Sequence, residues 1–167
     1  MIKSVYRGKF LKIYSQDIVL PNKNRMKVEY VKHPGAVCVA PFLNEDRIIL
    51  IRQFRPVIRR YIWELAAGTL NKDETIRESA QRELIEEIGY KAKTLKEIGW
   101  VYTTPGFTTE KIHIFIAEDL AKVKTEHEKD EVITSRVFTR AEIRRLFKKN
   151  LIVDAKTICA LRLCKII

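Results

Sequence analysis

Three glutamates, Glu83, Glu86 and Glu87, lie within five consecutive residues, shortly after Gly68. On a helix that turns about 100° per residue, their side chains share a sector roughly 100° wide. Neighbouring like charges on a helix repel each other by about 0.2–0.5 kcal/mol per pair, so this grouping is unfavourable by itself. Carboxylate oxygens are ligands that hard divalent cations such as Mg2+ and Mn2+ prefer. The cluster therefore indicates a metal-dependent catalytic site.

The residues around the cluster predict one helix that carries it, from Ile76 to Ile88, behind a glycine-containing loop. Thr75 and Glu78 have the spacing of a capping box, and Gly89 suits a helix C-terminus. Glu87 falls at the margin of the apolar face, where a carboxylate is costly unless a cation compensates it. Apolar residues recur every four positions and predict packing on a sheet: Ile76, Ala80, Leu84 and Ile88.

A surface helix with a solvated acidic face is the alternative, but it does not explain the arginine, the glycine and the flanking spacings together. The segment GTLNKDETIRESAQRELIEEIGY resembles the signature of the Nudix hydrolases. Its last position, usually aliphatic, is a tyrosine here. The matching positions are Gly68, Glu74, Arg82-Glu83-Leu84, Glu86-Glu87 and Gly89-Tyr90. The resemblance implies an α/β fold, a Nudix-like α/β/α sandwich with a mixed sheet.

Stretches outside this signature resemble the ADP-ribose pyrophosphatases among the Nudix hydrolases. Pro105 lies 15 residues beyond the signature, and further stretches read HPGAV, RQFRP and WELAAG. The resemblance implies Mg2+-dependent hydrolysis, with Mn2+ as an alternative ion, of the pyrophosphate bond in ADP-ribose to AMP and ribose 5-phosphate. Two alternatives stay open: hydrolysis of another nucleotide sugar, dinucleotide or RNA 5′ end, and a non-catalytic module that binds a nucleotide.

The resemblance also implies roles for the metal ligands. Glu83 and Glu87 match the principal ligands, and Glu86 matches a further or water-mediated one. The backbone carbonyl of Ala67 matches a ligand that no side-chain pattern would reveal. Arg82 would hold the carboxylates in place through charged hydrogen bonds.

The general base is implied to be a glutamate on the loop after the isoleucine-rich strand. Glu131, directly before Val132, fits this position best, and Glu128 is the second candidate. For either residue, a place in a solvated acidic loop is the alternative.

Four residues are candidates for substrate binding. Arg55 suits a phosphate because a guanidinium fork matches phosphate oxygens, whereas Arg52 would bind the substrate or serve the structure. Phe107 would stack on or flank the nucleotide, and we expect Trp63 to belong to the core instead. By analogy with the family's fold alone, Arg7 on the first strand would reach the adenosine bound by a partner subunit.

Composition predicts one globular domain over residues 1–167, since 46% of the residues are apolar. No segment has the apolar length of a membrane span and the N-terminus lacks an apolar signal core, so we expect a cytoplasmic protein. Cys38, Cys159 and Cys164 lie among apolar neighbours and predict buried, reduced thiols.

The formal net charge of +11 allows an anionic partner or a solvated basic surface. Lysines and arginines are spread along the chain without an aromatic-interleaved basic motif. We therefore expect a solvated basic surface without nucleic acid as a partner. The small nucleotide substrate is what the resemblance implies.

Alternating apolar residues, separated by turn signals, predict an N-terminal hairpin and six further strands. The expected strands are Val5 to Leu20, Met26 to His33, Ala36 to Phe42, Arg47 to Phe54, Tyr61 to Leu65, Thr94 to Tyr102, Lys111 to Glu118 and Val132 to Phe138. Thr139 with Glu142 predicts a second helix to about Lys149, and Asp154 a third to about Lys165. By the resemblance, residues 1–35 form the contact of a homodimer.

Overall fold

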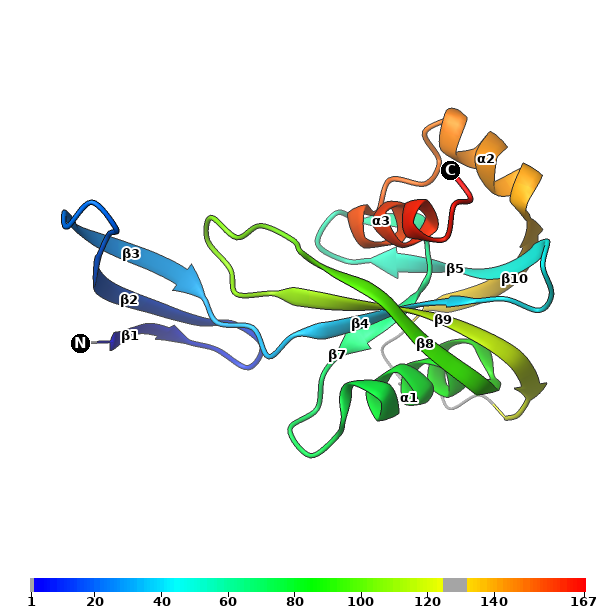
Figure 1. Ribbon diagram of the computed structural model, residues 1–167, viewed down its shortest axis with the longest axis horizontal. Helices are drawn as coiled ribbons and strands as arrows, with labels where there is room; N and C mark the ends of the chain where they lie inside the picture. Colours follow the sequence, from blue (N-terminus) through cyan, green and yellow to red (C-terminus); the bar gives the residue numbers. More distant parts are fainter. Residues whose placement is uncertain (1, 125–131) are drawn as a thin grey trace.

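The computed structural model describes residues 2–124 and 132–167, and Figure 1 shows a small N-terminal sheet extending from a larger body. The N-terminal sheet consists of β1 (Ile2–Arg7), β2 (Lys12–Val19) and β3 (Arg25–Val31). The body consists of β4 (Ala36–Pro41), β5 (Arg47–Arg55), β6 (Arg60–Glu64), β7 (Ala66–Thr69), α1 (Ile76–Ile88), β8 (Tyr90–Tyr102), β9 (Lys111–Lys122), β10 (Ile133–Thr139), α2 (Arg140–Lys148) and α3 (Ala155–Leu163).

Two sheets and the helices build the body. The mixed sheet has the order β7-β4-β9-β8, with β4 parallel to β9 and the other neighbours antiparallel. The second sheet has the order β10-β5-β6 and is antiparallel. Helix α1 packs on β7, β4 and β8, whereas α3 packs on β4, β8 and β9. Figure 1 shows α1 and α3 on opposite sides, which confirms the predicted α/β/α arrangement with a mixed sheet.

Strand β4 is buried along its whole length because both of its faces are covered. Val37 and Val39 pack in one apolar cluster with Leu84 of α1, and Cys38 packs in another with Leu161 of α3. Alternate residues of a strand point to opposite faces, so a strand between two helices needs apolar residues at every position.

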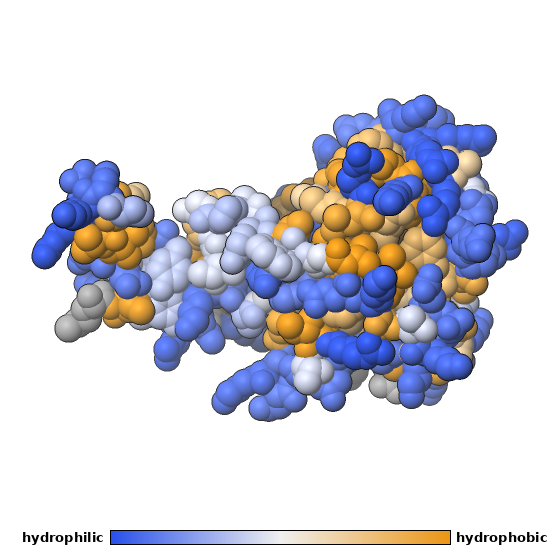
Figure 2. Space-filling model, viewed as in Figure 1, coloured by the Kyte–Doolittle hydropathy of each residue, from blue (hydrophilic) through white to orange (hydrophobic). Residues whose placement is uncertain are grey.

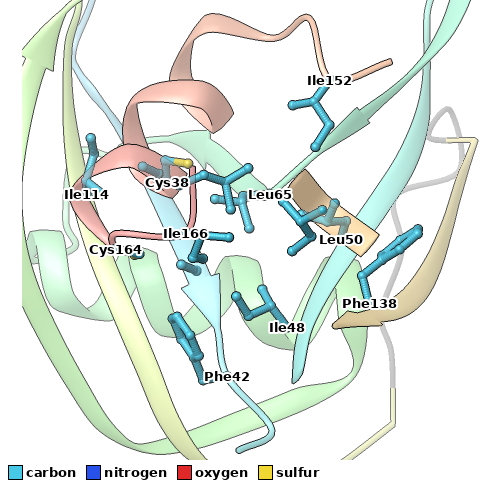
Figure 3. Packing of buried hydrophobic residues seen from close by; sticks show 14 of the residues in the cluster. Cys38, Phe42, Ile48, Leu50, Leu65, Ile114, Phe138, Ile152, Cys164 and Ile166 are labelled. Atoms are coloured by element: carbon cyan, nitrogen blue, oxygen red, sulfur yellow. The ribbon is translucent and has the colours of Figure 1, made fainter. Parts of the chain in front are cut away.

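The larger cluster fills the space between the two sheets, α2 and α3, and Figure 3 shows its side chains converging from these elements. Cys38 and Cys164 are buried within it and Cys159 is partly buried. All three are free thiols, as predicted. Burial raises the pKa of Cys38 and raises that of Cys164 to about 11, so both thiols stay protonated at neutral pH.

The N-terminal prediction is wrong in one respect. The segment expected as a single strand from Val5 to Leu20 is divided into β1 and β2 by a turn in which Gly8 N–H donates to the carbonyl of Leu11 at 2.8 Å. The N-terminal extension is therefore a three-stranded antiparallel sheet instead of a hairpin. A glycine followed by polar and apolar residues is a weak turn signal, and the alternation continues on both sides of it.

The segment before α1 also differs from the prediction. The residues expected to form a loop around Gly68 belong to β7, which pairs with β4, with Gly68 opposite Val37. Strand β8 begins four residues earlier than expected, at Tyr90, and β9 continues to Lys122. Pairing between β8 and β9 extends both strands beyond the part that alternates in sequence.

The three helices begin at the predicted residues. Thr75 with Glu78 and Thr139 with Glu142 form reciprocal capping boxes, and Asp154 caps α3 through Thr157 N–H. Helix α3 ends two residues earlier than predicted, at Leu163. Among the described residues, the structure contains no helix with the length and apolar character needed to cross a membrane.

Leu161 and Leu163 provide a test of the core around α3. Leu161 is fully buried, whereas Leu163 is 45% exposed on the same helix. We expect Leu161→Ala to lower the free energy of unfolding by about 2–5 kcal/mol, because it leaves a cavity in the larger cluster. Chemical denaturation measures this change, and Leu163→Ala is the matched control. Equal losses for the two variants would contradict the described packing of α3.

Candidate active site

Helix α1 carries the acidic cluster next to strand β7. Glu83 and Glu87, one helical turn apart, are 7% and 3% exposed, whereas the side chain of Glu86 is 28% exposed. Two carboxylates are therefore buried on the side of the helix that meets the sheet. Burial of a charged carboxylate is costly unless charges and hydrogen bonds compensate it.

Arg82 supplies much of that compensation. Its Nη1 donates to Glu83 Oε1 at 2.6 Å and to Glu86 Oε2 at 2.9 Å. Its Nε donates to both carboxylate oxygens of Glu74, at 2.9 and 3.1 Å, and its Nη2 donates to the carbonyl of Thr69 at 3.2 Å. Arg82 thus connects α1 by hydrogen bonds to Glu74 in the preceding segment and to Thr69 at the end of β7.

The charges in this network shift the pKa values of its members. Burial works against the charge on Arg82, but the hydrogen bonds with Glu74 and the interactions with Glu83 and Glu86 outweigh it and raise the pKa of Arg82. Hydrogen bonds from Arg82 and Ser79 hold the pKa of Glu74 below its ordinary value. Arg82 and Glu74 are therefore charged at neutral pH in this arrangement.

Gly68 is required by the position of Glu83. A Cβ atom built on Gly68 would lie 1.9 Å from Glu83 Oε1 and 2.2 Å from its Cδ. Any other residue at this position would therefore push the Glu83 carboxylate away from β7. The signature glycine thus acts by leaving room for a carboxylate instead of by forming a loop.

Ala67, directly before this glycine, contacts the second buried carboxylate. Its backbone N–H donates to Glu87 Oε2 at 2.9 Å. Strand β7 lies at the edge of the mixed sheet, with β4 as its neighbour in that sheet. In an antiparallel ladder the N–H and C=O of one residue point to the same side, so the carbonyl of Ala67 also points to the open edge of β7.

A hollow of about 800 Å³ opens beside these groups. Its walls come from α1, from β5 and β7 and from the turn between β1 and β2, and they include Lys9, Phe10, Arg55, Gly68, Arg82, Glu83 and Glu86. The volume falls within the range of about 300–1,000 Å³ that is typical of small-molecule sites. We call it the main hollow.

The oxygen atoms beside the main hollow suit a hard divalent cation. In the arrangement that the structure shows, no three His, Cys, Asp or Glu side chains within residues 2–124 and 132–167 are grouped to hold a metal. Arg82 Nη1 instead lies on Glu83 and Glu86. Carboxylates of Glu83 and Glu87 and an edge carbonyl nevertheless form the type of donor set that Mg2+ and Mn2+ prefer, and a cation would compete with Arg82 for the same oxygens.

Arg55 lines the main hollow, but its guanidinium is not isolated. Its Nε and Nη2 donate to the two carboxylate oxygens of Glu64, each at 2.6 Å. Glu64 is fully buried, and Lys156 of α3 donates to the same carboxylate. The hydrogen bonds that Arg55 donates to Glu64 raise the pKa of Arg55. Part of the Arg55 fork is thus engaged by the protein before any ligand binds.

The other residues expected to bind substrate do not line the main hollow. Arg52 lies 4.9 Å over the ring of Tyr61 in a cation–π contact, which favours a structural role. Phe107 is 58% exposed, and Arg7 is exposed at the end of β1. Trp63 packs edge-on against Phe138 with a centroid distance of 4.9 Å, which confirms that it belongs to the core.

Both candidates for the general base, Glu128 and Glu131, lie outside the described residues. The next residue along the chain, Val132, accepts a hydrogen bond at its carbonyl from Phe54 N–H at 3.1 Å. Ile133 then pairs with Gln53, which lines the main hollow. The first described residues after this gap, Val132 and Ile133, therefore lie beside strand β5 near this hollow.

Sequence analysis did not identify Glu64, Asp154 or Lys156 as site residues. Glu64 carried one signal, because an acidic residue between the apolar residues Trp63 and Leu65 predicts a buried, paired charge. Its second partner, Lys156, could not be found, because it is 92 residues away in sequence.

Gly68 generates a direct test of the site geometry. We expect Gly68→Ala to weaken Mn2+ binding by about 10- to 100-fold, because the new methyl group displaces the Glu83 carboxylate. Calorimetric titration measures the affinity. In the control Gly106→Ala, the added Cβ meets no atom within 4 Å, and affinity should stay at the wild-type value. Unchanged affinity in Gly68→Ala would show that the position of Glu83 against β7 does not matter.

Comparison with known proteins agrees with this geometry. Residues 32–161 match the NUDIX domain. The chain is 40% identical to an ADP-ribose pyrophosphatase of Bacillus subtilis (strain 168) and 35% identical to a methanol dehydrogenase activator of Bacillus methanolicus. Each alignment covers 96% of this chain and 88% of the relative.

A solved structure, the crystal structure of an ADP compounds hydrolase, superposes with a TM-score of 0.86. Its sequence is 25% identical, and the match covers 99% of this chain and 90% of that one. The resemblance found in the sequence is thereby confirmed. The chain belongs to the Nudix hydrolase family and is an enzyme of the pyrophosphatase type.

Proposed function

We propose that this protein hydrolyses the pyrophosphate bond of ADP-ribose, with Mg2+ as cofactor, to give AMP and ribose 5-phosphate. The observation that carries the proposal is the pair of buried carboxylates, Glu83 and Glu87, which face the edge of β7, with Glu83 lining the main hollow. Similarity to an ADP-ribose pyrophosphatase over 96% of the chain supports this substrate above other nucleoside diphosphate derivatives.

Glu83, Glu87 and the carbonyl of Ala67 would hold the cation, with Glu86 as a further or water-mediated ligand. Mn2+ fits the same oxygen donors. The bound ion would neutralise pyrophosphate oxygens and lower the pKa of a water molecule. When Glu83 and Glu86 turn to the ion, Arg82 would remain anchored by Glu74 and Thr69 and would keep the start of α1 in place.

Arg55 would bind a phosphate of the substrate. The fork to Glu64 uses Nε and one N–H of Nη2, and leaves Nη1 and the second N–H of Nη2 outside that contact. The charge and fixed plane of this guanidinium suit a phosphate oxygen beside the metal ligands. Arg52, Phe107 and Arg7 stay secondary candidates, since they do not line the main hollow.

Glu131 is our candidate for the general base, with Glu128 second, because Glu131 precedes the segment that pairs beside the main hollow. It would take the proton of the attacking water while the water oxygen bonds to one phosphorus. The bond from that phosphorus to the bridging oxygen would break, and the bridging oxygen would leave on the other phosphate.

The proposed function is tested with a panel of ADP-ribose, nucleotide sugars, dinucleotides and capped RNA in the presence of Mg2+. We expect ADP-ribose to have the highest kcat/KM and Glu87→Gln to lower it by at least about 100-fold. Glutamine keeps an acceptor for Ala67 N–H, so the variant should remain folded. Chromatography of the products measures turnover.

Glu118→Gln, at an exposed position of β9, is the control for loss of one carboxylate and should retain turnover. Glu131→Gln and Glu128→Gln should identify the base by the larger fall in kcat. A wild-type protein that binds Mg2+ and leaves every pyrophosphate in the panel intact would refute the proposed function.

We also propose that the protein is a homodimer joined through its N-terminal sheet. Cross-strand pairs place six apolar side chains on one face of this sheet: Ile2, Tyr14, Ile18, Met26, Val28 and Tyr30. Ile2 and Met26 are 56% and 49% exposed, and Figure 2 shows hydrophobic residues gathered at the outer end of the sheet. An exposed apolar face on a three-stranded sheet favours burial against a second copy.

A lysine substituted on one face or the other of the N-terminal sheet tests which face forms the dimer contact. Met26 lies on the apolar face, whereas the 66% exposed Val19 pairs with Arg25 on the other face. We expect the wild type to have twice the chain mass of 19.6 kDa and Met26→Lys to have the mass of a monomer. The reason is that the lysine would be buried in the dimer contact without a partner. Light scattering after size exclusion measures the mass. Val19→Lys should remain a dimer, and a monomeric wild type would contradict the assembly.

A further inference from the structure

The carboxylate of Glu64 is the centre of a charged cluster beside the active site. It is fully buried and receives two hydrogen bonds from Arg55 and one from Lys156. Lys156 also donates to Asp154 Oδ1 at 2.9 Å. The cluster thus contains two carboxylates and two cations, which balance each other.

Helix α3 positions the lysine of this cluster. Asp154 caps the helix by accepting from Thr157 N–H at 2.9 Å. Thr157 Oγ1 accepts from the backbone N–H of Leu65, directly after Glu64, at 2.9 Å. The first turn of α3 is therefore bonded to the junction between β6 and β7, and the Lys156 side chain is only 15% exposed.

The cluster connects two hollows. A second hollow of about 480 Å³, on the α3 side, is lined by Asp154, Lys156, Ala67 and Gly68, together with Arg55. Arg55, Ala67 and Gly68 line the main hollow as well. Arg55 thus lines the same two hollows as the proposed metal ligand on β7, and its side chain is 38% exposed.

We propose that Lys156 is a positioning residue for hydrolysis: by sharing Glu64 with Arg55, it keeps the N–H groups of Arg55 that lie outside the Glu64 contact available to bind a substrate phosphate. The inference rests on the proposed function, in which Arg55 binds that phosphate. Neither α3 nor Lys156 needs to touch the substrate for this role.

The physical reason is charge balance at a buried site. Without Lys156, Glu64 and Asp154 would carry two negative charges against the single positive charge of Arg55. The excess negative charge would hold Arg55 more tightly and would repel an anionic substrate. With Lys156 present, Arg55 and Lys156 both donate to Oε2 of Glu64. The negative charge of Glu64 is then divided between two cations and does not cancel the attraction of Arg55 for phosphate.

The test replaces the charge while keeping most of the side-chain volume. We expect Lys156→Met to raise KM for ADP-ribose about tenfold and to change kcat by less than about twofold. A phosphate contact made equally in the bound substrate and the transition state affects KM alone. Lys156→Arg should bring KM to within about threefold of wild type, because it restores the cation. Lys93→Met, at an exposed position of β8, controls for loss of a lysine and should leave KM unchanged.

Asp154→Asn separates charge balance from anchoring of the helix. Asparagine caps a helix as well as aspartate does, so α3 should keep its N-terminus. The variant removes a negative charge from the cluster, and we expect KM to stay equal or fall. A rise in KM as large as that in Lys156→Met would show that both residues only hold α3 in place, and would overturn the inference.

Binding of AMP and adenosine provides a readout that does not depend on turnover. We expect Lys156→Met to weaken AMP about tenfold in calorimetric titrations and to leave adenosine unchanged, since only AMP carries a phosphate. Equal affinity of wild type and variant for AMP would overturn the role of Lys156. If the wild type binds AMP but does not cleave ADP-ribose, the proposed substrate fails while the AMP comparison still decides the role of Lys156.

Discussion

Two carboxylates of α1, Glu83 and Glu87, are almost excluded from solvent, and much of the surrounding architecture serves to compensate them. The guanidinium of Arg82 lies on Glu83, and the backbone of β7 donates to Glu87. A buried carboxylate that lost its partners would cost several kcal/mol or take up a proton. A cation that bound here would therefore compete with the same groups that stabilise these carboxylates.

The edge of the mixed sheet is the second part of this arrangement. Strand β7 is paired through β4, so the backbone groups of Ala67 face α1 instead of another strand. Unpaired edges are usually a liability in a sheet. Here the edge is covered by α1, and the lack of a side chain at Gly68 allows the Glu83 carboxylate to approach it closely.

A further buried carboxylate, Glu64, is compensated by cations from both a strand and the C-terminal helix. Glu64, at the end of β6, has no contact with solvent and receives cations from β5 and from α3. Through this carboxylate the C-terminal helix is linked to an arginine in the main hollow, although α1 and α3 cover opposite sides of the sheet. The body of the protein thus couples its layers by ion pairs as well as by apolar contacts.

Much of the fold and part of the site could be predicted from sequence because their signals are local. Capping residues define the starts of all three helices, and the alternation of Ile112 and Ile114 marks a strand. Where local signals were weak, as at Gly8 and at Ala66–Thr69, the predicted boundaries were wrong. There, pairing between strands decided the structure.

The sequence by itself determined which helix carries the acids, that these acids share one face, and that Arg82 lies within reach of them, since a helix converts sequence spacing into direction. Tertiary structure alone decided what those acids face. Three of these arrangements bring together residues that are distant in sequence. Glu83 lies against the backbone at Gly68, Glu87 accepts a hydrogen bond from Ala67 N–H, and Lys156 donates to Glu64. Such contacts arise when layers pack, because burial of apolar surface sets the distances between layers and no local spacing encodes them.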